Sequence, residues 1–265
     1  SSTSRGLGDV YKRQFQNCLL GVCEPASLLG YNVLITTSNV HDISELQSLV
    51  ESNRVDGMLL TRALEDDRAL QYLSQVNFPT ALTGTCRYDN IIQVDTDNEG
   101  AAEKMTTLLI GKGFRRFAFL VKNMSYNVDR KRHEGFCRAL IKNGISEKDQ
   151  LFYNGSIRME FLDAIIENII SKKVECIICG DDEICTMVMS RLQAEGYRIP
   201  KDVAIASLYN STNLDCYSPA VTAVSVAASQ MGGAAVRQLI QRLRGENYEK
   251  KTMLDYDILF RKSTN

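Results

Sequence analysis

The chain has 265 residues, a formal net charge of -1 and 44% hydrophobic residues, which is enough for one large or two medium domains with real cores. Lysine and arginine are dispersed along the chain, so the basic footprint of a module that grips nucleic-acid phosphates is missing. No apolar run approaches the roughly 18 residues of a membrane span, and the sequence begins without a secretion signal pattern, so we expect a cytoplasmic protein with no membrane partner.

Residues 1–14 are polar and aperiodic, and we exclude them from the fold as non-native or disordered. After them, helical periodicity and short apolar runs alternate. The expected helices are 15–29, with a kink at Pro25, then 43–52, 66–75 and 99–110, and the expected strands are 32–36, 55–60, 79–83 and 91–94. This alternation predicts a doubly wound parallel sheet.

A second sheet begins at 116–121, so the first crossing between lobes is expected near Gly113. The further expected strands are 150–153, 176–179 and 203–207, and the helices are 128–143 and 159–171. Helix 229–243 then returns to the first lobe, and 253–260 is a strand. We expect residues 15–113 and 226–251 to form one lobe and residues 114–225 and 252–265 the other, joined by a three-crossing hinge.

The stretch 174–207 is the most informative part of the chain. Its apolar strand ends at Gly180 and is followed by Asp181, Asp182 and Glu183, acids that suit the start of a helix. A second apolar strand follows the helix, which predicts a right-handed parallel crossover. Ligands of such sheets bind beyond the strand carboxyl ends, so residues 180–183 and 208–212 are expected to face one crevice.

Eight cysteines are present, but a chain with good cores does not need disulfides, so we expect reduced and mostly buried thiols. Cys176 and Cys179 have the spacing of a redox or zinc pair, yet within a strand they point to opposite faces. His41 and His133 are far apart and have no partner motif. The sequence therefore predicts no catalytic histidine, no metal site and no cofactor.

Several short motifs occur in a fixed order along the chain. They are Val55-Asp56-Gly57, Asp97-Asn98, Gly113-Phe114-Arg115-Arg116, Arg132 with Gly135-Phe136, Asp181-Asp182, Ile199-Pro200-Lys201-Asp202-Val203, Pro219 with Val221-Thr222, and Arg261-Lys262-Ser263-Thr264. Over residues 15–264 this order resembles the lactose-repressor (LacI/GalR) family of bacterial transcriptional regulators. The resemblance implies a two-lobed, periplasmic-binding-protein-like fold of type I that binds a small sugar-like or related effector.

In that family a DNA-binding helix-turn-helix, a hinge helix and a first strand precede the part seen here. The resemblance therefore implies an effector-binding core that contacts DNA only through a head outside this sequence, and that forms a homodimer. Because the missing strand is central in its sheet, its neighbours would keep unpaired backbone groups, so we expect the chain by itself to be poorly stable.

Arg132 is the best candidate for an effector contact, since the resemblance places its guanidinium in the cleft and a rigid fork of donors suits a sugar diol or a carboxylate. The alternative is a solvated helix face, because Arg130, Lys131 and Arg132 are consecutive. The resemblance also implies an effector contact from Asp181. The alternative is that one member of the Asp181-Asp182 pair only caps the helix, and for Asp182 capping is the expected sole role.

Tyr209 and Asn210 stand where the family usually has an Asp pair, and core or interface packing is an equal alternative for Tyr209. Thr61, Arg62 and Gly84 follow strands at the cleft rim, where ordinary loop roles are the alternative, and Gly84 often corresponds to a polar contact in the family. We therefore expect a ligand that differs from the commonest sugars, or a pocket no longer used for sensing.

Two other functions remain to be weighed. A periplasmic sugar-binding component of a transporter shares the fold, but the motif at 199–203 and the tail at 261–264 resemble the regulators more. An enzyme is not expected, because no nucleophile paired with a base and no glycine-rich phosphate loop is present.

Overall fold

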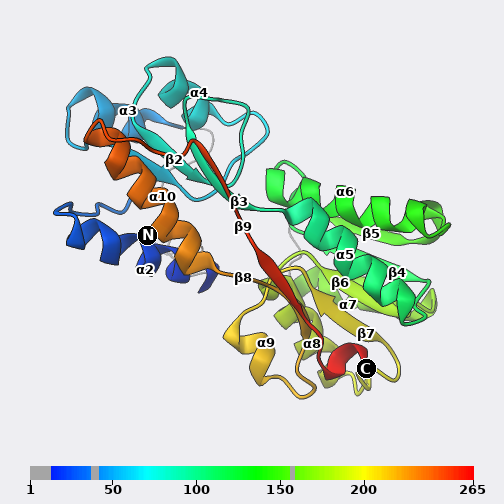
Figure 1. Cartoon of the computed structure of the whole chain (residues 1–265). Helices are drawn as coiled ribbons and strands as arrows, with labels where there is room; N and C mark the ends of the chain where they lie inside the picture. Colours follow the sequence, from blue (N-terminus) through cyan, green and yellow to red (C-terminus); the bar gives the residue numbers. More distant parts are fainter. Residues whose placement is uncertain (1–12, 37–41, 156–158) are drawn as a thin grey trace. The chain divides into compact units, whose positions relative to one another are not determined.

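The computed structural model describes residues 13–36, 42–155 and 159–265. These residues form two units. The first unit contains the described residues up to 96 and residues 227–254, and the second contains the described residues of 97–226 and residues 255–265. The chain therefore passes between the units after residues 96, 226 and 254. The first passage lies before α5 (Asn98–Gly111) and not near Gly113 as the sequence suggested, because α5 packs along α6 (Asn127–Lys142) in the second unit (Figure 1).

The first unit contains a parallel sheet of four strands in the order β1 (Met58–Leu60), β2 (Thr80–Thr83), β3 (Ile92–Thr96) and β9 (Lys251–Leu254). β2 and β3 are buried at every position, as expected for strands covered on both faces. The helices of this unit are α2 (Arg13–Leu28), α3 (Ser44–Glu51), α4 (Arg68–Gln75) and α10 (Ala228–Leu243).

Helices α2 and α10 lie side by side in the first unit (Figure 1). Two glycines allow this close approach. A Cβ atom on Gly21 of α2 would overlap the carbonyl oxygen of Ser229, and one on Gly232 of α10 would overlap the carbonyl oxygen of Cys18. The glycines thus bring the two helix backbones closer than larger residues would permit.

The strand expected at residues 32–36 is not formed, so that prediction was wrong. Residues 31–36 have no regular secondary structure, and Leu34 and Ile35 are 59% and 49% exposed. An apolar run becomes a strand only where a neighbouring strand supplies hydrogen-bond partners. Among the described residues, no strand pairs with this run, and β1 is the edge strand of the sheet.

The second unit contains a sheet of six strands in the order β10-β8-β7-β6-β4-β5. All neighbours are parallel except β10 and β8. The strands are β4 (Phe117–Val121), β5 (Leu151–Asn154), β6 (Cys176–Cys179), β7 (Ala204–Ser207), β8 (Thr222–Val226) and β10 (Tyr256–Leu259). Besides α5 and α6, its helices are α7 (Met159–Ser171), α8 (Asp182–Ala194) and α9 (Thr212–Cys216), with single 3-10 turns η1 (Glu147–Asp149) and η2 (Lys262–Thr264). The fold is thus the expected mixed α/β architecture built on parallel sheets.

The six-stranded sheet has an apolar core on each face. Cys179 packs in one core with Leu192 of α8, and Cys176 packs in the other with Phe136 of α6. The prediction that these cysteines point to opposite faces is therefore confirmed, and both thiols are free and fully buried. Burial raises the pKa of both thiols.

The closing tail is anchored inside the second unit. Ser263 donates a hydrogen bond from Oγ to the carbonyl oxygen of Ile205 at 2.6 Å and accepts one from the backbone N–H of Thr222 at 2.8 Å. The hydroxyls of Thr264 and Thr222 also share a hydrogen bond of 2.7 Å. The tail motif therefore links β7 to β8 through buried side chains, which is a structural role.

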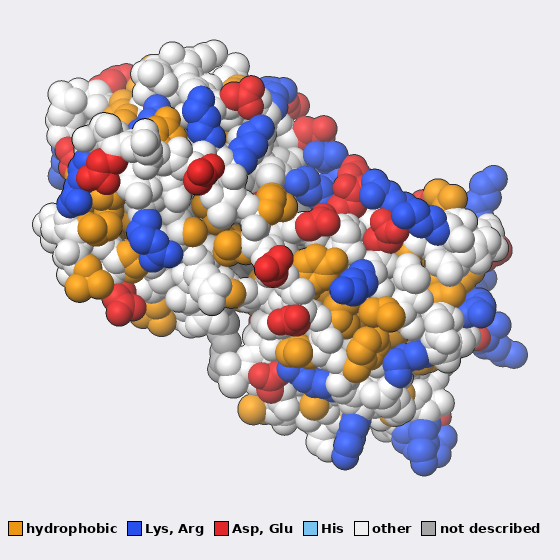
Figure 2. Space-filling model, viewed as in Figure 1, with side chains coloured by type: hydrophobic (Ala, Val, Ile, Leu, Met, Phe, Trp, Pro, Cys, Tyr) orange, Lys and Arg blue, Asp and Glu red, His pale blue; other side chains and the backbone are white. Residues whose placement is uncertain are grey.

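On the face drawn in Figure 2, acidic and basic side chains are interspersed, in keeping with the net charge of -1. None of the helices described is long and apolar enough to cross a lipid bilayer.

Candidate functional site

The carboxyl ends of β4, β6 and β7 lie next to one another in the second unit. The strands are parallel neighbours, and their ladder continues one residue beyond the strands. Gly180 donates its N–H to the carbonyl oxygen of Leu120 at 2.7 Å, and Leu208 donates to Cys179 at 2.8 Å. The loops that begin at Lys122, Gly180 and Leu208 therefore leave the sheet side by side, which is where parallel α/β sheets bind ligands.

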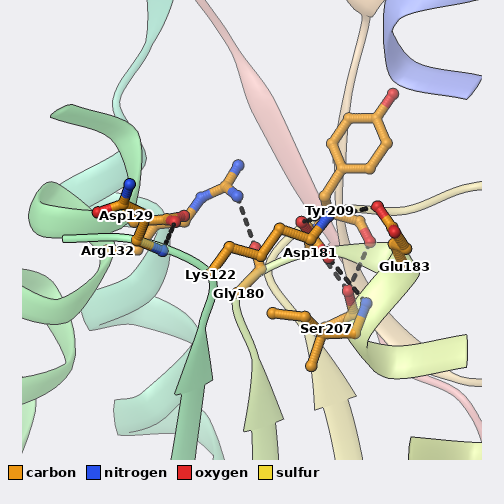
Figure 3. Close-up of polar contacts among 10 residues, drawn as sticks. Lys122, Asp129, Arg132, Gly180, Asp181, Glu183, Ser207 and Tyr209 are labelled. Atoms are coloured by element: carbon orange, nitrogen blue, oxygen red, sulfur yellow. Dashed lines mark hydrogen bonds and ion pairs between the residues drawn. The ribbon is translucent and has the colours of Figure 1, made fainter. Parts of the chain in front are cut away.

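Arg132 of α6 reaches this edge of the sheet. Its Nη1 donates to the carbonyl oxygen of Gly180 at 2.5 Å (Figure 3). Its Nε donates to Oδ1 of Asn98 at 3.1 Å. The residue is only 5% exposed. The alternative that Arg132 lies on a solvated helix face is therefore wrong.

The sequence around Arg132 explains this placement. A Cβ atom on Gly135 would overlap the carbonyl oxygen of Glu99, so glycine is what lets α6 lie against α5. One turn beyond Arg132, Phe136 stacks on Phe119 of β4 with ring centroids 4.7 Å apart. The glycine and the phenylalanine together fix the rotation of α6 about its axis and so direct Arg132 to the strand ends.

Asp129 lies one turn before Arg132 and is also buried. Its Oδ2 accepts a hydrogen bond from the backbone N–H of Asn123 at 3.0 Å. Burial raises the pKa of Asp129, and the positive charge of Arg132 opposes that shift only in part. The sequence pattern did not single out Asp129, because an Asp in the first turn of a helix is ordinary.

Lys122, the first residue after β4, forms ion pairs with two acids of the neighbouring loop. Its Nζ lies 2.6 Å from Oδ2 of Asp181 and 2.5 Å from Oε2 of Glu183 (Figure 3). Burial lowers the pKa of Lys122, but the two carboxylates outweigh burial, and the net shift is upward. Lys122 was missed from the sequence, although its position directly after a buried strand was a usable signal.

Asp181, and not Asp182, caps α8. Oδ1 of Asp181 accepts a hydrogen bond from the N–H of Ile184 at 2.9 Å, while Asp182 is already the first helical residue. The alternative that gave Asp182 the cap as its only role is therefore wrong. A cap needs extended backbone at the residue before the helix, and Asp181 has φ -144° and ψ 175°. Burial raises the pKa of Asp182.

Tyr209 and Asn210 follow β7 at the same edge of the sheet. Tyr209 is 2% exposed, and its backbone is held by Ser207, whose Oγ donates to the carbonyl oxygen of Tyr209 at 2.6 Å. Asn210 accepts a hydrogen bond from Nη1 of Arg261 at 2.9 Å. Arg261 also pairs with Asp215, so Asn210 belongs to a contact with the closing tail.

Thr61, Arg62 and Gly84 belong to the first unit, where they follow β1 and β2. Since these strands are parallel neighbours, Thr61 and Gly84 lie at the same carboxyl edge of the four-stranded sheet. Gly84 has φ +138°, which favours glycine, and it donates to the carbonyl oxygen of Val94 at 2.8 Å. The structure thus brings Arg132, Asp181, Tyr209 and Asn210 to one sheet edge and the other three candidates to another.

The edge of the second sheet combines donors and acceptors within a small region. Arg132 and Lys122 supply charged N–H donors, and Asp181 and Glu183 supply carboxylate acceptors. Such a set suits a polar solute that presents several hydroxyl or amine groups. Among the described residues, the one trio whose ligand atoms could share a metal ion lies elsewhere, on α6 and η1.

Comparison with known proteins agrees with this architecture. Residues 106–264 match the family model of the periplasmic binding protein-like domain. The chain is 26% identical over 256 residues to the HTH-type transcriptional regulator CelR of Thermobifida fusca, covering 94% of this chain and 75% of the relative.

Two solved structures are also similar. A LacI transcriptional regulator of Bacillus cereus subsp. cytotoxis superposes with a TM-score of 0.90 at 27% identity, covering 98% of this chain and 95% of that one. A complex of the regulator CelR with cellobiose superposes with a TM-score of 0.87 at 25% identity, covering 98% and 82% of the two chains. The chain therefore belongs to the periplasmic binding protein-like domain family, in the form that LacI-type transcriptional regulators carry.

Proposed function

We propose that this chain is the effector-sensing core of a bacterial LacI-type transcriptional regulator and that Arg132 anchors the effector. The observation that carries the proposal is the buried guanidinium held between Gly180 and Asn98 at the carboxyl edge of the second sheet. A buried arginine is costly unless it is well paired, and the two hydrogen bonds position it before any ligand arrives. The relatives described above are named as regulators, which supports this function over a transporter component or an enzyme.

The effector that we propose is a sugar-like molecule with several hydroxyl groups. Hydroxyls both donate and accept, so they can satisfy a guanidinium and a carboxylate at once. The CelR complex holds cellobiose, which places a sugar in a related protein. The resemblance to the family implies that Tyr209 and Asn210 stand where an Asp pair is usual, so we propose a ligand distinct from the commonest sugars.

Effector binding would act on DNA through a separate domain of the intact regulator. A ligand that binds one conformation of the protein more tightly than another shifts the population toward the conformation that it prefers. The coupling free energy is set by the difference between the two binding free energies. The net charge of -1 and the dispersed lysines and arginines of the sequence support the view that this core does not contact DNA by itself. We further propose a cytoplasmic homodimer, as expected for such a regulator.

The test is a calorimetric screen of monosaccharides, disaccharides and nucleobases against the purified chain, followed by Arg132→Ala. Hydrogen bonds to a charged group contribute about 1.5–3 kcal/mol, so the affinity of a hit should fall by roughly 10- to 150-fold. Arg138→Ala is the matched control, because Arg138 also lies on α6 but pairs with Glu99 and Glu103 and is 49% exposed. Equal affinity in the wild type and in Arg132→Ala would remove Arg132 from the site.

A further inference from the structure

A second cluster of chemically reactive side chains lies on α6, and the proposed effector site does not use it. His133 and Cys137 are four residues apart on the helix, and Glu147 comes from η1, which follows the helix. Sγ of Cys137 lies 3.5 Å from Nε2 of His133 and 3.2 Å from Oε1 of Glu147. One ligand atom from each of the three residues lies within 4.8 Å of the other two.

The three residues lie close enough to hold one tetrahedral zinc ion once their side chains turn toward it. With Zn–S near ~2.3 Å and Zn–N near ~2.0 Å, tetrahedral geometry separates the sulfur and the nitrogen by about 3.5 Å. Sγ of Cys137 lies 3.5 Å from Nε2 of His133 and 3.8 Å from Nδ1, so it lies beside the ring, and the imidazole must rotate about its side-chain bonds to direct a nitrogen at the ion while α6 keeps its place. Thiolate, imidazole and carboxylate are also the three side-chain ligands that zinc accepts.

We propose that His133, Cys137 and Glu147 form a zinc-binding site with an open fourth position. Glu147 is exposed, so the side of the cluster formed by η1 faces solvent and leaves room for a water ligand. The site would tie α6 to the segment that leads into β5. It depends on no residue of the proposed effector site and stands or falls independently of it.

The surroundings favour a bound cation. Phe152 lies 4.3 Å from the His133 ring and Phe119 lies 5.8 Å from it, measured between ring centroids, so two aromatic rings flank the imidazole. Glu134 adds a second negative charge beside the cluster, although it also pairs with Arg130. The carboxylates of Glu147 and Glu134 attract a divalent cation, although both are exposed and solvent screens part of this attraction.

The alternative is a plain hydrogen bond from the Cys137 thiol to Glu147 with no metal affinity. Cobalt(II) in place of zinc distinguishes the metal site from the plain hydrogen bond, because ligation of cobalt by a thiolate gives an intense near-ultraviolet charge-transfer absorption. We expect one equivalent of cobalt to bind with this absorption, and zinc to displace it. Titration of the 265-residue chain with cobalt(II) and then with zinc under reducing conditions provides the measurements.

Three substitutions test the ligands individually. Cys137→Ser should abolish the absorption, while His133→Gln and Glu147→Gln should each weaken binding by more than about 10-fold, the loss seen when even an outer partner of a metal site is removed. Cys216→Ser is the control, because Cys216 is an exposed free thiol elsewhere in the unit. Zinc should raise the thermal midpoint of the wild type and of Cys216→Ser but not of Cys137→Ser. Undiminished zinc affinity in both Cys137→Ser and His133→Gln, or no cobalt absorption in the wild type, would overturn the proposal.

Discussion

Arg132 donates a 2.5 Å hydrogen bond to the carbonyl oxygen of Gly180, 48 residues further along the chain. The bond joins the helix that follows β4 to the loop that follows β6, so two strand-helix units whose strands are neighbours in the sheet are tied at the end that carries the polar residues. The guanidinium is therefore structural before it binds any ligand.

Arg132→Ala should lower the free energy of unfolding by about 2–4 kcal/mol, because the substitution removes the Arg132 donor to the Gly180 carbonyl and the larger of the two positive charges beside Asp129. Urea denaturation gives the measurement. Arg138→Ala, at a half-exposed surface ion pair, should stay within about 0.5 kcal/mol of the wild type. Equal losses in the two variants would show that Arg132 contributes no more than a surface pair.

The position of Arg132 at the strand ends was expected only from the resemblance to the family, because the consecutive residues Arg130, Lys131 and Arg132 taken alone favour a solvated helix face. The packing of Gly135 and Phe136 that directs Arg132 became visible in the structure. The sequence was sufficient for the parallel sheets, because buried strands such as β6 read as unbroken apolar runs. The strand expected at 32–36 failed, because strand formation depends on a partner that the local pattern cannot reveal.

The spacing of residues along the sequence could not predict side-chain contacts between segments that are distant in the chain. Lys122 and Asp181 are 59 positions apart, and only the register of β4 against β6 brings them into contact. Glu147 meets Cys137 through the turn after α6, so a search for a second histidine could not have found that trio. Asp181 and Asp182 are adjacent acids, and only backbone angles decide which one caps the helix.

Gly135→Ala should destabilise the chain by more than about 2 kcal/mol, because the new methyl group would overlap the carbonyl oxygen of Glu99 and force α6 away from α5. Gly111→Ala is the matched control. It lies in the last turn of α5 with no heavy atom within 4 Å of the added Cβ. Because alanine has a higher helix propensity than glycine, this change should be neutral or stabilising by up to about 1 kcal/mol. Similar stability of the two variants in chemical denaturation would contradict close α5–α6 packing.

The pKa of Asp129 gives a pH-dependent prediction. Burial holds its pKa above the ordinary value of about 3.9, against the opposing charges of Arg132 and Lys122 and with Asp181 adding to the shift. The stabilisation that the protonated carboxyl of Asp129 contributes is therefore fully present below about pH 3.9. It is lost as the pH rises through the folded-state pKa. The unfolding free energy of Asp129→Asn relative to the wild type should increase from pH 4 toward neutrality.

Asp202 provides a control of opposite sign. Hydrogen bonds from Arg198 lower the pKa of Asp202 to about 2. Its stabilising effect is present above the unfolded-state pKa of about 3.9 and is lost as pH falls toward the folded-state value. The stability of Asp202→Asn relative to the wild type should thus decrease as pH rises from about 2 to about 4 and stay nearly level above that. Parallel pH profiles for the two variants would exclude the proposed origin of the Asp129 shift.

Ser263→Ala tests whether the closing tail is an integral part of the second unit. The buried hydroxyl donates to Ile205 and accepts from Thr222, so its removal leaves a buried N–H and a buried carbonyl each without one partner. Such a loss costs about 1–3 kcal/mol, and thermal unfolding should show a clear decrease in the midpoint. Ser190→Ala, at an exposed position of α8, removes a hydroxyl without burying an unpaired group and should change stability by less than about 0.5 kcal/mol. If Ser263→Ala unfolded at the wild-type midpoint, the tail would be held by Thr264 and Arg261 alone, and its serine would be dispensable.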